Sequence, residues 1–192
     1  SMEYMSKGTL TRRLNNLSII DALKTAVLVT DALYYGRMNR LAHRWVTPDN
    51  IYFDDNEIPK LGNWRTASIT QKLYKNPNLN DIVTVYYPPE KVASGQGGLD
   101  YFSDIYQMGA VLFTMLTGKP IFNETGEALI EKIKNGHAHA ANFHNPDISL
   151  ELDKVIKLCL AKNKKDRYQS TAALKNDLLK ILASYESARK TT

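Results

Sequence analysis

The sequence predicts a mainly α-helical domain with one small β-hairpin. In several long stretches apolar residues recur at three- or four-residue steps, which is the period of an amphipathic helix. Residues 103–116, SDIYQMGAVLFTML, are apolar on almost every side, and a helix without a polar face belongs in the middle of a domain. We therefore expect a helical bundle around a buried central helix, with the hairpin at its side.

The elements before the central helix are a long helix and the hairpin. Ile20, Leu23 and Val27 begin an apolar period that continues through Leu41, which predicts a helix over residues 19–41. Two extended pieces, 51–53 and 58–61, flank a turn whose Asp and Asn residues favour chain reversal.

Residues 62–100 are polar and rich in Pro and Gly, so we expect a long irregular segment there. Behind the central helix a Gly-then-Pro stop at 118–120 ends the helical pattern. Ser149 and Ser170 stand where N-caps are needed. Apolar spacing predicts the further helices at about 124–135, 150–161 and 171–184.

Composition is that of one ordinary globular domain. The chain has 192 residues, with 43% hydrophobic and 23% charged residues and a formal net charge of +5. Its single Cys159 excludes an intramolecular disulfide framework, so a reducing, cytoplasmic location is expected. No apolar stretch is long enough for a membrane span. The charges are spread along the chain except for a basic run at 162–167, so no nucleic-acid partner is expected.

Five short motifs stand in a fixed order along the chain. They are His43-Arg44-Trp45-Val46-Thr47-Pro48-Asp49-Asn50, Lys60-Leu61-Gly62-Asn63-Trp64-Arg65, Tyr87-Pro88-Pro89-Glu90, Ser103-Asp104-Ile105-Tyr106-Gln107-Met108-Gly109 and Lys165-Asp166-Arg167-Tyr168. This order resembles the eukaryotic-type protein kinase superfamily, from its catalytic loop H-R-D-L-x-x-x-N through the D-F-G and A-P-E positions to a late arginine. The ordered set covers nearly the whole chain.

The resemblance implies a protein-kinase-like C-terminal lobe as one domain over residues 1–192. Within it, residues 1–8 resemble the hinge, 43–50 the catalytic loop, 63–90 the activation segment and 103–117 the central buried helix. The Gly-rich loop, the phosphate-binding lysine and its glutamate partner belong to the family's other lobe. No G-x-G-x-x-G occurs in this sequence.

Most catalytic positions of the family carry a different residue here. Trp45 stands at the aspartate base, Thr47 at the usual lysine, and Asn63 at the D-F-G aspartate, while Asn50 matches the second metal ligand. An indole has one donor and no basic atom, so it cannot take a proton. The resemblance therefore implies a pseudokinase that is no enzyme, with Asn50 as a vestige and no cofactor, since ATP and Mg²⁺ binding would be weak or absent.

The residues that the family uses for architecture are retained. The resemblance implies that Glu90 and Arg167 form an ion pair and that Asp104 accepts amides from the catalytic loop. It also places His43 between the central helix and Trp64.

Arg44 has two interpretations, binding of loop carbonyls or of a phosphorylated residue of the activation segment. The candidate acceptors for that phosphate are Thr66, Ser68, Thr70 and Tyr74.

Other candidates have plainer interpretations. His137, His139 and His144 have a metal-like spacing, but no carboxylate or thiolate completes a set, so we expect a loop cluster and no metal. Cys159 lies among aliphatic residues and is expected in the core.

Three functions follow from these observations. The first is a catalytically inactive module that binds or regulates a protein, with another kinase or its own N-terminal region as the candidate partner. The second is part of a weakly active Ser/Thr protein kinase whose ATP-binding lobe lies outside this chain. The third is an adaptor for anionic ligands through residues 162–167. Self-association also stays open, because a lobe without its companion would expose apolar surface.

Overall fold

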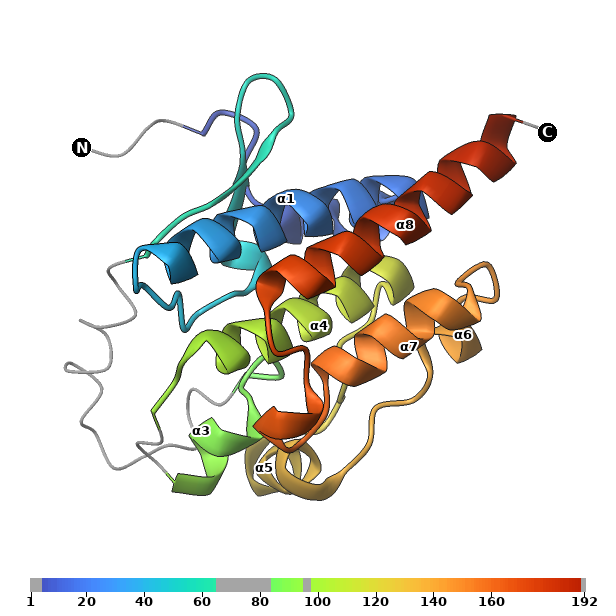
Figure 1. Cartoon of the computed structure of the whole chain (residues 1–192). Helices are drawn as coiled ribbons and strands as arrows, with labels where there is room; N and C mark the ends of the chain where they lie inside the picture. Colours follow the sequence, from blue (N-terminus) through green and yellow to red (C-terminus); the bar gives the residue numbers. More distant parts are fainter. Residues whose placement is uncertain (1–4, 65–83, 95–97, 191–192) are drawn as a thin grey trace.

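The computed structural model describes residues 5–64, 84–94 and 98–190. Its centre is α4, Tyr101–Thr117, in which every residue from Ser103 to Leu116 is buried. In Figure 1 the other helices surround α4. The predicted fold class, mainly helical with a small hairpin, is confirmed.

Helix α4 has a capping residue at each end. The Asp100 side chain accepts from the backbone N–H groups of Phe102 and Ser103, which supplies partners for orphan donors of the first turn. At the other end Gly118 adopts φ 66°, the left-handed conformation that glycine takes without strain.

Two long helices lie side by side over α4. They are α1, Ile19–Met38, and α8, Thr171–Lys190 (Figure 1). Helix α1 ends before the predicted residue 41, because the N–H of Leu41 bonds back to the carbonyl of Gly36 and Arg40 turns to φ 59°. Helix α8 runs past the predicted residue 184, because Tyr185 and Glu186 hold its last turns to Asp147 and Lys24.

The remaining helices lie on the other side of α4. Helix α7, Leu150–Cys159, packs against α4 and begins at Ser149, whose side chain accepts from Leu152 N–H as predicted for an N-cap. Helix α5, Gly126–Asn135, packs on the short α3, Pro89–Ser94, at the bottom of Figure 1. The four-residue α6, Ala141–His144, precedes α7.

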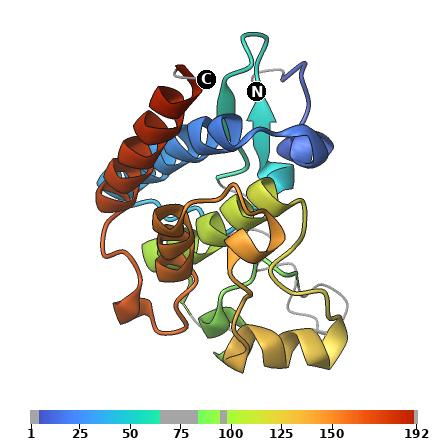
Figure 2. The ribbon, with the colours of Figure 1, turned by 90° about the vertical axis from the view of Figure 1, so that its right-hand side faces the viewer.

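The predicted hairpin is present. Strands β1, Ile51–Phe53, and β2, Pro59–Leu61, are antiparallel with Ile51 opposite Leu61. The Asp54 carboxylate accepts the N–H groups of Asn56 and Ile58 and so fixes the turn. Figure 2 shows the hairpin beside the 3₁₀ helix η1, Leu10–Asn16, which the sequence analysis did not predict.

Of the irregular segment expected over residues 62–100, residues 65–83 and 95–97 lie outside the described residues, and the expectation is wrong over α3. Pro89 opens α3, because the fixed φ of proline suits a first helical turn and its missing N–H costs nothing there. Two further short elements are the 3₁₀ helices η2, Pro48–Asn50, and η4, Lys164–Asp166. Each has three residues, which is too short for an apolar period in the sequence to predict it.

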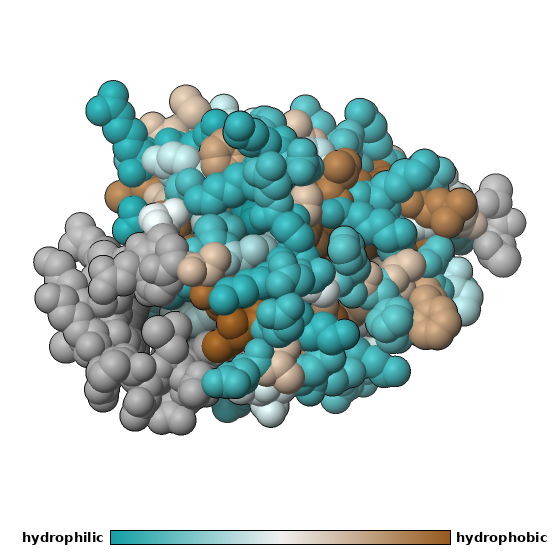
Figure 3. All heavy atoms as spheres, turned by 90° about the horizontal axis from the view of Figure 1, so that it is seen from below, coloured by the Kyte–Doolittle hydropathy of each residue, from teal (hydrophilic) through white to brown (hydrophobic). Residues whose placement is uncertain are grey.

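The length of the helices and the hydropathy of the surface are the last features of the fold. None of the described helices is long and apolar enough to cross a membrane. On the face seen from below, hydrophilic side chains predominate and apolar ones are scattered among them (Figure 3).

Candidate functional site

The loop 43–50 is held against α4 by a buried carboxylate. One Asp104 oxygen accepts from the backbone N–H of His43 at 2.8 Å, and the other accepts from that of Arg44 at 2.5 Å. Burial raises the pKa of Asp104 to about 7, against the two backbone donors, which lower it. These bonds fix the first two residues of the loop to the rigid centre of the fold.

A second residue of α4 continues this attachment. Gln107 is buried, its Oε1 accepts from Val46 N–H at 3.0 Å, and its Nε2 donates to the Arg44 carbonyl at 3.3 Å. Gln107 is a further residue of the site that the motifs did not single out. Its signal was a polar amide within an apolar helix, because a buried amide needs hydrogen-bond partners.

His43 is buried and connects the loop to the hairpin. Its Nε2 donates to the Gly62 carbonyl at 2.7 Å, and its Nδ1 accepts from Trp45 N–H at 3.2 Å, which defines a neutral tautomer. Burial lowers the pKa of His43 to about 4, although the bond to Gly62 acts in the opposite direction. His43 is therefore a structural residue at neutral pH and not a proton carrier.

Two asparagines face each other where the loop ends. Asn50 donates through Nδ2 to the Trp45 carbonyl at 2.8 Å, and its Oδ1 accepts from Asn63 Nδ2 at 2.8 Å. Asn63 also donates to the Tyr52 hydroxyl at 3.0 Å. Asn63 has φ 62°, a conformation that asparagine tolerates better than most residues. The structure thus brings together the two positions that the family uses for metal.

These donors do not fit a magnesium site well. Mg²⁺ in phosphate-transfer sites is usually held by one or two carboxylates, whereas both side chains here are neutral amides. The Asn50 oxygen already accepts an N–H from Asn63. The nearby Asp49 carboxylate accepts from the Thr11 hydroxyl at 2.6 Å. Within the described residues no three His, Cys, Asp or Glu side chains form a metal-binding group.

The base position carries no proton acceptor. Trp45 is half-buried, and its ring meets that of Tyr87 edge-on at 5.6 Å. Thr47 is buried, and its hydroxyl has no hydrogen-bond partner among the described residues. The indole thus ties the loop to the residues before α3.

Trp64 takes the place that the family gives to phenylalanine. Its ring meets the His43 ring edge-on at 4.9 Å, and its Nε1 donates to the Leu61 carbonyl at 2.8 Å. A Cβ on Gly36 would lie 2.3 Å from the Trp64 ring, so only glycine leaves room for the indole. The sequence analysis did not identify this role of Gly36, since a glycine within a helix does not show what approaches it.

Arg44 keeps both of its interpretations. It has φ 68°, and its Nε is buried without a hydrogen-bond partner among the described residues. No bond from the Arg44 side chain to a carbonyl is present in that part of the chain. The proposed phosphate acceptors Thr66, Ser68, Thr70 and Tyr74 lie outside the described residues.

Glu90 and Arg167 form the expected pair. Arg167 Nη1 and Nη2 donate to the two Glu90 oxygens at 2.9 and 2.8 Å, and the guanidinium is 0% exposed. Burial alone would raise the pKa of Glu90, but the bonds from Arg167 and Ser103 outweigh it and hold that pKa below its usual value. Three carbonyls accept the remaining Arg167 donors, those of Ala161, Phe102 and Lys162.

Three of the four cations in the basic run at 162–167 have partners within the fold. Lys162 donates to the Lys132 and Ile133 carbonyls at the end of α5, Lys164 pairs with Asp100 at 2.8 Å, and Arg167 is buried. Lys165 is exposed and has no side-chain partner in the described part of the chain, so the adaptor hypothesis stays a prediction that would depend mainly on this residue.

Cys159, His139 and His144 contact other side chains of the fold. Cys159 is fully buried, and burial raises the pKa of its thiol, which disfavours the reactive thiolate. The rings of His139 and His144 lie 6.1 Å apart, and both contact Phe143.

Comparison with known proteins identifies the family. The family model described as the protein kinase domain matches residues 1–179. The chain therefore belongs to the protein kinase family, as the order of its motifs indicated.

Its relatives are serine/threonine-protein kinases by name. It is 28% identical over 188 residues to a probable serine/threonine-protein kinase of Clostridium acetobutylicum, covering 96% of this chain and 28% of that protein. It is 28% identical over 186 residues to the serine/threonine-protein kinase PknB of Mycobacterium leprae, covering 94% of this chain and 30% of PknB. Calcium-dependent protein kinase 5 of Plasmodium falciparum is 28% identical over 174 residues, covering 88% of this chain and 30% of that protein. The chain thus spans less than a third of the length of these relatives.

These names correct one expectation. The substitution of Trp45 for the aspartate base predicted that the chain is no enzyme. That expectation is wrong, since the relatives are named as protein kinases and point to an enzyme. The physical reason for the error is that a missing base lowers the rate of a transfer that depends mostly on positioning, and does not by itself define the class of the protein.

Proposed function

We propose that the chain is the C-terminal lobe of a weakly active serine/threonine protein kinase whose ATP-binding lobe lies outside these 192 residues. The family match and the names of the relatives support the class of enzyme. In this proposal residues 1–8 are the hinge, 43–50 the catalytic loop, 63–90 the activation segment and 103–117 the central helix. A protein partner remains a further prediction.

The observation that carries the proposal is the attachment of the loop to α4. Asp104 and Gln107 hold the backbone from residue 43 to 46. At the end of the loop the Asn50 side chain donates to the carbonyl of Trp45, five residues before it. Phosphoryl transfer depends on positioning and charge stabilisation more than on covalent chemistry of the protein. A loop fixed at both ends supports that positioning function.

The activation segment is attached in the same way at its far end. Glu90 is bound by Arg167 and Ser103, so the chain that reaches α3 has a fixed end point. In the proposed enzyme this end point positions the surface that receives a serine or threonine side chain.

The weak rate follows from position 45. A general base contributes about 100- to 10,000-fold to a reaction, so a kinase with an indole there is expected to be slower by at least that factor, and the neutral Asn50 and Asn63, which fit magnesium poorly, lower the rate further. His43 does not stand in for the base, because it is buried, hydrogen-bonded and neutral.

The test is a transfer assay with the full-length natural protein. We expect γ-labelled ATP to label casein on serine or threonine, slowly but above a blank without protein. Asn50→Ala is expected to reduce that label, since it frees the Trp45 carbonyl and Asn63, whereas Asn176→Ala on the exposed surface of α8 is the matched control. Label no higher than the blank would overturn the proposal.

A further inference from the structure

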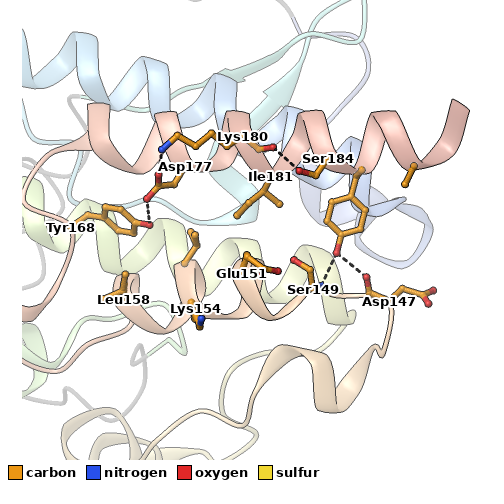
Figure 4. Close-up of a pocket in the computed structure, with 13 residues that line it drawn as sticks. Asp147, Ser149, Glu151, Lys154, Leu158, Tyr168, Asp177, Lys180, Ile181 and Ser184 are labelled. Carbon is orange, nitrogen blue, oxygen red and sulfur yellow. Dashed lines mark hydrogen bonds and ion pairs between the residues drawn. The ribbon is translucent and has the colours of Figure 1, made fainter. Parts of the chain in front are cut away.

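A groove between α7 and α8 lies outside the loop and ion-pair residues described above. It has a volume of about 620 Å³, and Figure 4 shows the residues that line it. On α8 it extends from Asp177 to Ala188, which is about 16 Å, or three helical turns. On α7 it extends from Glu151 to Leu158.

The floor of the groove is apolar. Val155 and Ile181 belong to it, and Leu158 at its edge is 47% exposed. The tyrosine hydroxyls of the lining are already used. Tyr185 accepts from Ser149 N–H at 2.7 Å and donates to the Asp147 carbonyl at 2.8 Å, and Tyr168 donates to Asp177 at 2.9 Å. An occupant would therefore meet mainly carbon atoms.

The two ends of the groove differ in charge. At one end Asp177 is neutralised by Lys180 at 3.0 Å, and the bonds from Lys180 and Tyr168 lower the pKa of Asp177. Toward the other end the carboxylates of Asp147 and Glu151 have no hydrogen-bond or ion-pair partner in the described part of the chain, and with Lys154, which lines the groove one turn beyond Glu151, they leave one net negative charge there. Figure 4 shows Tyr168 and Asp147 at opposite ends. An occupant is therefore favoured if it carries positive charge at the Asp147 end.

The walls also decide the shape of the occupant. Both are helices whose backbone groups are bonded internally, so they offer an extended peptide no edge to pair with. A helix needs no such edge, and apolar side chains at i, i+3 or i+4, and i+7 fill a groove of this length. The open side of the groove leaves the polar face of such a helix in water.

We propose that the α7–α8 groove binds an amphipathic α-helix of a partner protein. Its apolar side chains pack on Val155, Leu158 and Ile181, and a lysine or arginine at one end pairs with Asp147 and Glu151. This surface is independent of the proposed transfer reaction, since it shares no residue with the loop 43–50 or with the Glu90–Arg167 pair.

The test is a selection of peptides on the 192-residue chain. A displayed library of 14-residue peptides is panned on the immobilised chain and depleted on the Leu158→Asp variant. We expect enriched peptides with apolar residues at helical spacing and a basic residue at one end. A selected peptide, labelled with fluorescein, should bind Leu158→Asp at least tenfold more weakly than the parent. Leu179→Asp, on an α8 residue that is 42% exposed outside the groove, is the matched control and should bind as the parent does.

A charge exchange tests the orientation. Glu151→Lys should weaken the same peptide, and replacing the terminal basic residue of the peptide by glutamate should restore binding to that variant. Glu127→Lys on the exposed surface of α5 should have no effect. Melting curves establish that each variant is folded.

Three results would overturn the proposal. They are a library without enrichment of the pattern, equal binding to Leu158→Asp, and a chain dimer in sedimentation that Leu158→Asp abolishes. The last result would assign the groove to a second copy of the chain.

Discussion

The pair of Glu90 and Arg167 supports the most direct prediction on stability. Arg167→Ala removes a guanidinium whose five N–H groups all have acceptors, two on Glu90 and three on backbone carbonyls. The variant leaves a carboxylate that is 17% exposed without its cation. The Ser103 hydroxyl still donates to Glu90 at 2.7 Å, and Lys164 lies 3.9 Å from it but also binds Asp100, so these contacts offset only part of the lost two-pronged pairing.

The magnitude follows from this geometry. Removing one partner of a buried ion pair costs about 3 to 5 kcal/mol. For a domain of this size 1 kcal/mol corresponds to roughly 2 to 4 °C in Tm, so we expect a loss of about 6 to 20 °C. Arg167→Lys keeps the charge but loses the two-pronged geometry, and should fall between the parent and Arg167→Ala.

Thermal unfolding of the 192-residue chain, followed by circular dichroism, measures these shifts. Lys165→Ala is the matched control, because its exposed side chain has no partner among the described residues and should change Tm by about 1 °C. An Arg167→Ala chain that melts within about 2 °C of the parent would refute the reasoning.

The remaining predictions concern the loop and the core. Gly36→Ala should displace the Trp64 ring, lower stability by about 1 to 3 kcal/mol and shift tryptophan fluorescence; an unchanged spectrum and Tm would contradict the contact. Cys159 should react with a thiol reagent only as fast as the chain unfolds, and immediate labelling in native buffer would contradict its burial. The lowered pKa of His43 gives stability that is present above pH 6.5 and is lost as pH falls toward 4, whereas the raised pKa of Asp104 gives stability that is lost as pH rises through about 7. In the parent the two changes largely offset each other between pH 7 and 5. In Asp104→Asn only the His43 change remains, so urea unfolding should show that the free energy of unfolding falls by about 2 kcal/mol more than in the parent as pH goes from 7 to 5. Parallel pH profiles of the two proteins would contradict this.

The elements with a strong period could be predicted from the sequence. The central helix, the hairpin and the cores of α1, α5, α7 and α8 follow apolar spacing, which records the side that each element buries. The predicted ends of the helices were less accurate. Helix α8 continues to Lys190 through contacts of Tyr185 and Glu186 with distant parts of the chain, and such contacts leave no local pattern.

The sequence positions of the site residues could be predicted, but the hydrogen bonds between them could not. Motif order located Asn50 and Asn63, but the bond between them depends on how the hairpin folds back. Gly36 was missed because a close ring contact is a tertiary fact, whereas Gln107 had a local signal, a polar amide within an apolar helix, that was not used. The family was predicted correctly, but the expectation that the chain is no enzyme was wrong, because the substitution at Trp45 was given too much weight against the family as a whole.

Restoring the missing base tests the central claim most directly. The rate of γ-phosphate transfer is measured for the full-length protein and for its Trp45→Asp variant under the same conditions. The account predicts slow transfer by the parent and a rate about 100- to 10,000-fold higher in the folded variant, because a carboxylate then stands on a loop that Asp104 already positions. A folded Trp45→Asp variant that transfers no more phosphate than a protein-free blank would contradict it.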